Sequence, residues 1–172
     1  AIDGDLDTTF GTGGGVITEL VGRDSWISAV AVQGDGKLVA VGQVFDQVEA
    51  ISEGLIARYN PDGTLDATFG EGGLLLLRAV FSAPFWFDFD LRAVAIQPDG
   101  RIVAAGGGVI ARWNGDGTLD PTFGDGGIVI ETRFFALALA IQDDGRLVTG
   151  GEQVGASDFS LARYHADGTS DA

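Results

Sequence analysis

The sequence contains no cysteine, no methionine and a single histidine. Without cysteine the chain can form no disulfide, no thiolate nucleophile and no sulfur-based metal site. His165 lies in a turn with no second histidine nearby, so we expect a solvated turn residue rather than a catalytic base. The serines lack both a G-x-S-x-G context and the partners of a catalytic triad. These absences predict that the chain is not an enzyme.

Basic residues are also scarce, with 10 Lys and Arg against 25 Asp and Glu, which gives a net charge of −15. Such a field repels nucleic-acid backbones and anionic lipid surfaces, so we expect no nucleic-acid partner. No apolar run is long enough to cross a membrane, and membrane insertion is not expected. An acidic chain without oxidisable sulfur suits an extracellular or cell-surface position on a bacterium. The charge favours cations, basic partners or neutral glycans.

What the sequence does contain is glycine, 28 residues in all, and much of it lies in a repeated motif. The motif reads NPDGTLDATFGEGG at 60–73, NGDGTLDPTFGDGG at 114–127 and AIDGDLDTTFGTGG at 1–14. Its beginning returns as HADGTSDA at 165–172. We therefore predict a single repeat domain over 1–172, with units of approximately 5–63, 64–117 and 118–172.

Each unit contains four short runs rich in Val, Ile and Leu, and the runs are bounded by Gly and Asp. Such runs predict β-strands, and Asp-Gly between two of them predicts a hairpin. The predicted strands are 15–20, 27–33, 37–42 and 55–60; then 74–80, 92–97, 101–106 and 109–114; then 128–132, 136–142, 146–151 and 159–164. The pattern predicts an all-β chain of three four-stranded antiparallel meanders, each covered on both faces.

Alternation of turns along a meander places both Asp-Gly turns of each unit on one side and the other connections on the opposite side. The connections on that opposite side vary in length, and the longest are 43–54 and 81–91. Binding surfaces are usually built on such variable loops.

The recurring pattern LD-x-TFG-x-GG, AVAxQxDG and (I/L)AR-aromatic-x-x-DGT resembles the delta-sixty repeat of large secreted bacterial proteins. The order of runs and turns also loosely resembles the NHL propeller blade. The resemblance implies β-propeller blades and surface exposure, and it brings no established catalytic residues. A propeller ring needs about four to eight blades. Three units would leave the ring incomplete, to be closed by another chain or by more repeats.

The acidic turns are the candidate metal sites, because oxygen ligands around a glycine turn suit Ca²⁺. No other cofactor is expected. The alternative is a hairpin whose aspartates cap local amides, which is the ordinary role of Asp-Gly. The spacing N-x-D-G-x-x-D occurs twice, and its candidate calcium ligands are Asn60, Asp62, Asp66, Asn114, Asp116 and Asp120.

Three arginines lie in the middle of apolar strands, Arg58, Arg112 and Arg163. A buried arginine must be paired, so we expect a structural role in which each meets a carboxylate such as Asp66, Asp120 or Asp7. An inward ring that binds an anionic ligand is the alternative.

Aromatic residues gather in one variable connection, FSAPFWFDFD at 81–90. If exposed, they would form an interface or a sugar-stacking platform; if buried, they would cap the end of the stack. The candidate ligand or interface residues are Phe81, Phe85, Trp86, Phe87 and Phe89, with Phe134 and Phe135 in the equivalent connection of the next unit.

Together these observations predict a non-enzymatic structural or adhesive module that assembles through open blade edges and the aromatic connection. Its partners would be copies of itself, in an oligomer or filament, or further repeats of a longer chain. The alternative is a carbohydrate-binding, lectin-like propeller, with calcium as a possible aid. A propeller hydrolase or lyase has the least support, because no carboxylate pair stands out.

Overall fold

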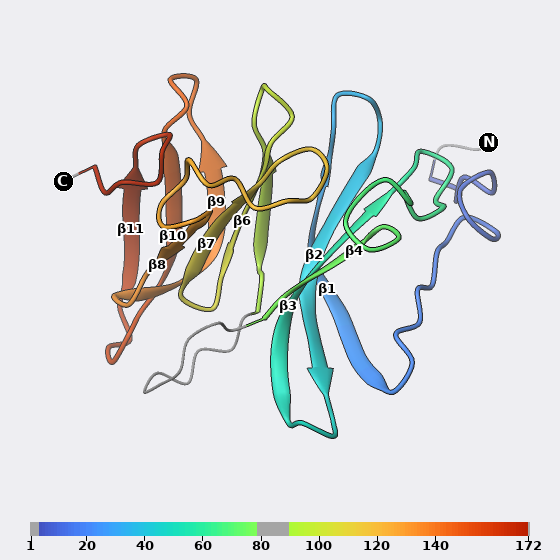
Figure 1. Cartoon of the computed structure of the whole chain (residues 1–172), viewed down its shortest axis with the longest axis horizontal. Coiled ribbons are helices and arrows are strands. Elements are labelled where there is room, and N and C mark those ends of the chain that lie inside the picture. The colour runs from blue at the N-terminus through green and yellow to red at the C-terminus, as the bar shows by residue number, and fades with distance from the viewer. Residues whose placement is uncertain (1–3, 79–89, 172) are drawn as a thin grey trace.

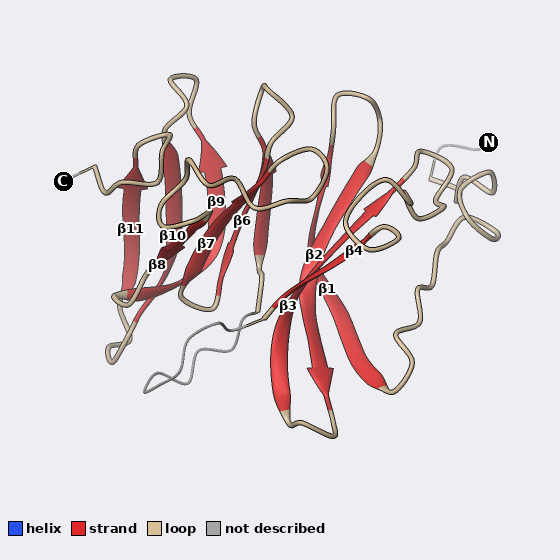
Figure 2. Cartoon of the chain, in the orientation of Figure 1, coloured by secondary structure: helices blue, strands red, loops and turns tan. Residues whose placement is uncertain are grey.

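The computed structural model describes residues 4–78 and 90–171, and within them every regular element is a β-strand (Figure 2). The described part of the chain contains no helix long and apolar enough to cross a membrane. The predicted all-β class is therefore confirmed.

The strands form three antiparallel sheets, and in each sheet the strands follow one another in chain order. Sheet 1 contains β1 (Arg23–Val32), β2 (Leu38–Asp46), β3 (Ile51–Tyr59) and β4 (Leu74–Leu77). Sheet 2 contains β5 (Ala93–Ile96), β6 (Ile102–Gly106), β7 (Val109–Trp113) and β8 (Ile128–Ile130). Sheet 3 contains β9 (Phe134–Ile141), β10 (Leu147–Gln153) and β11 (Phe159–Tyr164). Within the described residues, sheet 3 has three strands.

The strand predicted over 15–20 is not formed, and the described residues around it make only isolated bridges at Gly11, Thr12 and Gly15. The reason lies in how the equivalent strands of the other two repeats, β4 and β8, are paired. β4 pairs with β3 and β8 pairs with β7, so each completes the sheet that comes before it in the chain. No described strand precedes residues 15–20. The repeat units and the sheets are therefore out of phase by one strand.

The core lies between the sheets, as two clusters on either side of sheet 2. Ile102 and Ala104 of β6 belong to the cluster shared with sheet 1, whereas Val103 and Ala105 belong to the cluster shared with sheet 3. Successive side chains of a strand point to opposite faces. Sheet 2 is thus buried on both faces, which explains why its strands have no polar alternation.

The three sheets stand side by side, with the N-terminal segment and sheet 3 at opposite ends of the row (Figure 1). The hairpins β1–β2, β5–β6 and β9–β10 lie at the upper side in this view, and the connections β2–β3 and β10–β11 lie at the lower side. This arrangement agrees with the two-sided division expected from the alternation of turns. β5 contacts β1 and β2, and β9 contacts β5 and β6.

Candidate functional site

The same group of residues occupies each of the two junctions between sheets, and we call it the junction cluster. Its arginine comes from the third strand of a sheet, and its other members come from the loop that follows. The cluster of sheet 1 consists of Arg58, Asp66, Thr68, Phe69 and Gly70, and that of sheet 2 of Arg112, Asp120, Thr122, Phe123 and Gly124.

A buried ion pair forms the centre of the cluster in sheet 1. Arg58 Nε donates to Asp66 Oδ2 at 2.7 Å, and Lys37 Nζ lies 3.0 Å from the same oxygen. Asp66 Oδ1 accepts from the Thr68 hydroxyl at 2.7 Å and from the Thr68 amide at 3.0 Å. The Thr68 hydroxyl, followed by Lys37, the Thr68 amide and Arg58, holds the pKa of Asp66 far below its ordinary value, although burial opposes the shift. Asp66 is therefore charged and fully paired.

The rest of the cluster reaches the neighbouring sheet. Arg58 Nη1 donates to the Gly115 carbonyl at 2.5 Å, and the Gly70 amide donates to the Asp116 carbonyl at 3.1 Å. Both carbonyls belong to the turn between β7 and β8. The guanidinium carbon of Arg58 also lies 4.4 Å from the centre of the Phe69 ring, within the range of a cation–π contact. Sheet 1 thus binds the Asp-Gly turn of sheet 2.

Sheet 2 binds sheet 3 in the same way. Arg112 Nε donates to Asp120 Oδ2 at 2.8 Å, and Arg112 Nη1 donates to the Ala166 carbonyl at 2.5 Å. The Gly124 amide donates to the Asp167 carbonyl at 2.8 Å. Burial acts to raise the pKa of Asp120, but the hydrogen bonds from Thr122 and the nearby arginines outweigh it and the pKa is lowered. The contact between sheets is therefore a repeated one.

The glycine of each Asp-Gly turn is required by the junction as well as by the hairpin. Gly117 has a φ of +94°, and a Cβ there would lie 3.0 Å from the Gly70 amide nitrogen and 3.2 Å from the Phe69 ring. Gly168 has a φ of +87°, and its Cβ would lie 2.9 Å from the Phe123 ring. Sequence reasoning assigned these glycines to hairpins alone. The arginine, the aspartate and TFG keep the same spacing in both complete repeats, and this was the one sequence signal of a shared structural role.

At the end of sheet 3 the cluster is exposed. Arg163 Nε pairs with Asp171 Oδ2 at 2.5 Å, but the Arg163 side chain is 51% exposed. The arginine partners expected from the sequence are thus formed for Asp66 and Asp120, and the partner of Arg163 is Asp171 rather than Asp7. Asp7 accepts from the Thr9 amide and hydroxyl instead.

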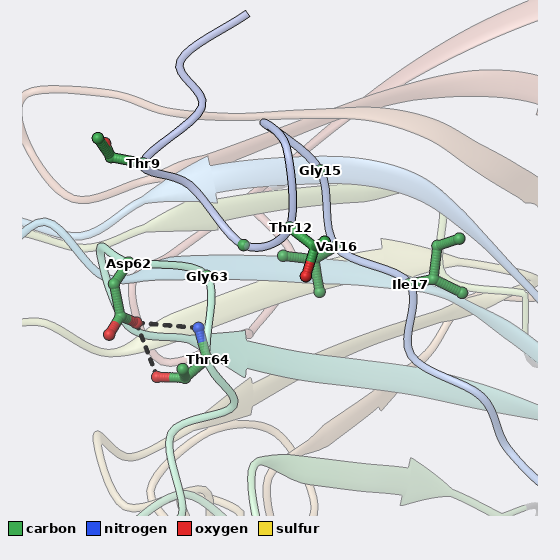
Figure 3. Close-up of a pocket in the computed structure, with 9 residues that line it drawn as sticks. Thr9, Thr12, Gly15, Val16, Ile17, Asp62, Gly63 and Thr64 are labelled. Carbon is green, nitrogen blue, oxygen red and sulfur yellow. Dashed lines mark hydrogen bonds between the residues drawn. The ribbon is translucent and has the colours of Figure 1, made fainter.

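Residues 5–20 place a third, partial copy of the contact against sheet 1. The Gly11 amide donates to the Asp62 carbonyl at 2.8 Å. The position of a Cβ on Gly63 would lie 2.8 Å from Val16 Cγ2. Figure 3 shows residues 9–17 running alongside the 62–64 turn. The two segments line an open groove of about 840 Å³.

The acidic turns use their oxygens for local hydrogen bonds. Asp62 Oδ1 accepts from the Thr64 amide at 2.9 Å and the Thr64 hydroxyl at 2.7 Å, and Asp116 binds Thr118 at the same distances. Asn60 and Asn114 donate to these threonine hydroxyls. Residues 4–78 and 90–171 include no group of three or more His, Cys, Asp or Glu arranged for a metal. The geometry supports amide capping, and calcium binding stays a prediction that calorimetric titration would test.

Most of the predicted aromatic site, Phe81, Phe85, Trp86, Phe87 and Phe89, lies outside the described residues. Phe134 does not face outward, because it is buried in the core between sheets 2 and 3. Phe135, its neighbour on β9, has a side chain that is 37% exposed. Phe134 therefore stabilises the stack rather than offering a ligand surface.

Two buried glutamates on the side of the variable connections were missed from the sequence. Glu53 accepts from Arg23 Nη1 at 3.0 Å and from Arg78 Nε at 2.6 Å. Glu131 accepts from Arg133 and from the Tyr164 hydroxyl. Burial, followed by Glu131, raises the pKa of Tyr164. Glu53 was missed because 43–54 was interpreted as a connection, whereas β2 and β3 extend into it.

The geometry can be compared with known proteins. A family model described as a domain of unknown function (DUF5122) beta-propeller matches residues 33–69, 97–123 and 142–172, which together are more than half of the chain. A comparison with curated proteins gives no match. The first two matched segments begin at the glutamine before a hairpin and end at the phenylalanine of a junction cluster. Sheets 1, 2 and 3 are therefore propeller blades, called blades 1, 2 and 3 from here on, and the chain belongs to the DUF5122 beta-propeller family.

Proposed function

We propose that this chain is a non-enzymatic structural module that associates with further blades of its own type through its open faces. The observation that carries the proposal is the exposure of one position on β11. Leu161 is 74% exposed, whereas its equivalents Ile56 and Ile110 are 0% exposed inside the two junctions. Arg163 is likewise exposed where Arg58 and Arg112 are buried.

The opposite end of the stack presents the complementary face. Val94 and Ile96 of β5 pack into the core between blades 1 and 2. Their equivalents on β1, Val30 and Val32, are exposed. Blade 3 thus exposes the face that blades 1 and 2 use toward the following blade, and blade 1 exposes the face that blades 2 and 3 use toward the preceding one. A closed propeller leaves neither uncovered.

The proposed partners are a second copy of this chain or further repeats of the same kind. The acidic composition and the lack of oxidisable sulfur support an adhesive or assembly role at the surface of a bacterial cell or outside it. Assignment to the delta-sixty repeat is part of the same proposal. Carbohydrate binding depends on the aromatic residues at 81–89, which lie outside the described residues, and it stays a prediction.

Light scattering coupled to size exclusion tests the proposal over the micromolar range. The wild-type chain is expected to show a mass above that of the monomer, rising with concentration. Leu161→Lys places a charge on the open face and should leave a monomer. Val48→Lys is the matched control, because Val48 is exposed in the β2–β3 loop, away from both faces. A wild-type chain that stays monomeric throughout would exclude the proposal.

A further inference from the structure

The outer edge of β11 lacks a neighbour that both equivalent strands possess. β3 pairs with β2 on one side and β4 on the other, and β7 pairs with β6 and β8. Among the described residues, β10 is the only strand that pairs with β11, and beyond it Tyr164 makes an isolated bridge to Ser170. An unpaired strand edge presents a row of amides and carbonyls that can bind another strand.

Residues 5–20 lie on blade 1 as the segment carrying β4 lies on blade 2. In the first contact the Gly11 amide donates to the Asp62 carbonyl, and in the second the Gly70 amide donates to the Asp116 carbonyl. Val16 approaches Gly63 as Leu75 approaches Gly117. The segment therefore occupies the position of a fourth strand of a preceding blade. In the two complete blades this position pairs with the third strand of the blade. Within the described residues, no strand pairs with residues 15–20 in that way.

One chain cannot supply both halves of this pairing to itself. The N-terminal segment and β11 lie at opposite ends of the row of blades, with blade 2 between them (Figure 1). Residues 15–20, which fit this edge as a fourth strand, therefore cannot reach β11 within one molecule. A second copy carries that strand already held in position by its own blade 1.

We propose that residues 15–18 of a second copy complete blade 3 as its fourth strand, so that copies join head to tail. This inference rests on the proposed function and names the surfaces that meet. The register follows from the two complete blades. Ile56 pairs with Leu75 and Ile110 with Val129, which places Leu161 opposite Val16. Leu55 pairs with Leu76 and Val109 with Ile130, which places Ser160 opposite Ile17.

The same contact uses the other open groups at both ends. Leu161 would be covered by Val30 and Val32 of the second copy, as Ile56 lies in one core with Val94 and Ile96. Arg163 would donate to the Pro61 carbonyl of that copy, as Arg58 donates to the Gly115 carbonyl. The two surfaces differ, so the interface is heterologous and gives a closed ring or an open chain according to its rotation.

Single cysteines test the contact cleanly, because this chain contains no other cysteine. Ser160→Cys and Ile17→Cys are purified separately, mixed and oxidised, and the products are separated without reductant and identified by mass spectrometry. Facing positions on paired strands are within the range of a disulfide. A mixed Ser160–Ile17 dimer is expected in the mixture, in large excess over either homodimer. Ser160→Cys mixed with Val48→Cys is the control, since Ile17 and Val48 are both 92% exposed.

The outcomes separate this inference from the proposed function. Suppose that light scattering shows association but the disulfides join Ser160→Cys to itself, or mixed dimers are no more abundant than in the control. This result would overturn the head-to-tail contact and leave the proposed function standing. A monomeric wild-type chain would overturn both. A chain that carries both Ser160→Cys and Ile17→Cys reports the geometry of the assembly. After oxidation a closed ring gives one covalent species and an open chain gives a ladder of species, and either result supports the contact.

Discussion

Removing the arginine of a junction cluster should cost much more stability inside the stack than at its end. Arg112→Met keeps an unbranched apolar stem and removes the guanidinium with its charge. Asp120 would then be buried without its main partner, and the Ala166 carbonyl and the Thr122 hydroxyl would each lose a donor. Arg163→Met is the matched variant, because Arg163 has an aspartate partner but is half exposed.

The expected magnitudes follow from burial. Removing one partner of a buried ion pair costs about 3–5 kcal/mol, because the remaining charge is left uncompensated. Arg101 Nε stays 3.0 Å from Asp120, which places Arg112→Met at the lower end, about 3 kcal/mol. An exposed pair contributes less than about 1 kcal/mol, and Arg163→Met should stay below that. For a chain of this size, the loss at Arg112 corresponds to roughly 6–12 °C in Tm.

Urea unfolding followed by tryptophan fluorescence measures the difference, since Trp113 is buried at the junction between blades 1 and 2. The free energies are compared at protein concentrations where light scattering shows the monomer, so that association does not contribute. Equal m-values for the variants would justify comparing their midpoints. Equal losses for Arg112→Met and Arg163→Met, or a loss below about 1 kcal/mol for Arg112→Met, would refute the junction cluster as a stabilising contact.

Two further predictions concern the same junctions. Gly117→Ala should destabilise the chain by more than about 1 kcal/mol, because the new Cβ strains a positive φ and crowds Gly70 and Phe69. Gly115→Ala is the control and should change the stability little, because a Cβ there meets open space. Similar unfolding midpoints for the two variants would contradict this prediction. The pKa values of Asp66 and Asp120 lie below the ordinary 3.8, so the unfolded chain takes up their protons first and stability should be full above about pH 4 and fall progressively below it. Urea midpoints measured from neutral pH to about pH 2 check this, and Asp66→Asn should lower the midpoint near neutral pH and make the decline shallower; a wild-type midpoint that does not change with pH would contradict it.

The strands, the hairpins and the repeat were predictable because they depend on local chemistry. Runs of Val, Ile and Leu favour extended backbone, and Asp-Gly permits the positive φ of the turn. The Arg58–Asp66 and Arg112–Asp120 pairs could also be anticipated, since a charged residue in an apolar strand needs a partner.

Only the tertiary structure decided which surfaces meet. Residues 15–20 have the sequence of a strand and still form none, because a strand needs a neighbour and the described chain places none beside them. Phe134 appeared as suitable for a binding surface as Phe135, and packing of blade 2 on blade 3 buried it. Glu53 acquired its role from Arg23 and Arg78, which lie 30 and 25 residues away in the chain. Contacts over such distances depend on how whole sheets stack, and no local pattern in the sequence specifies that stacking.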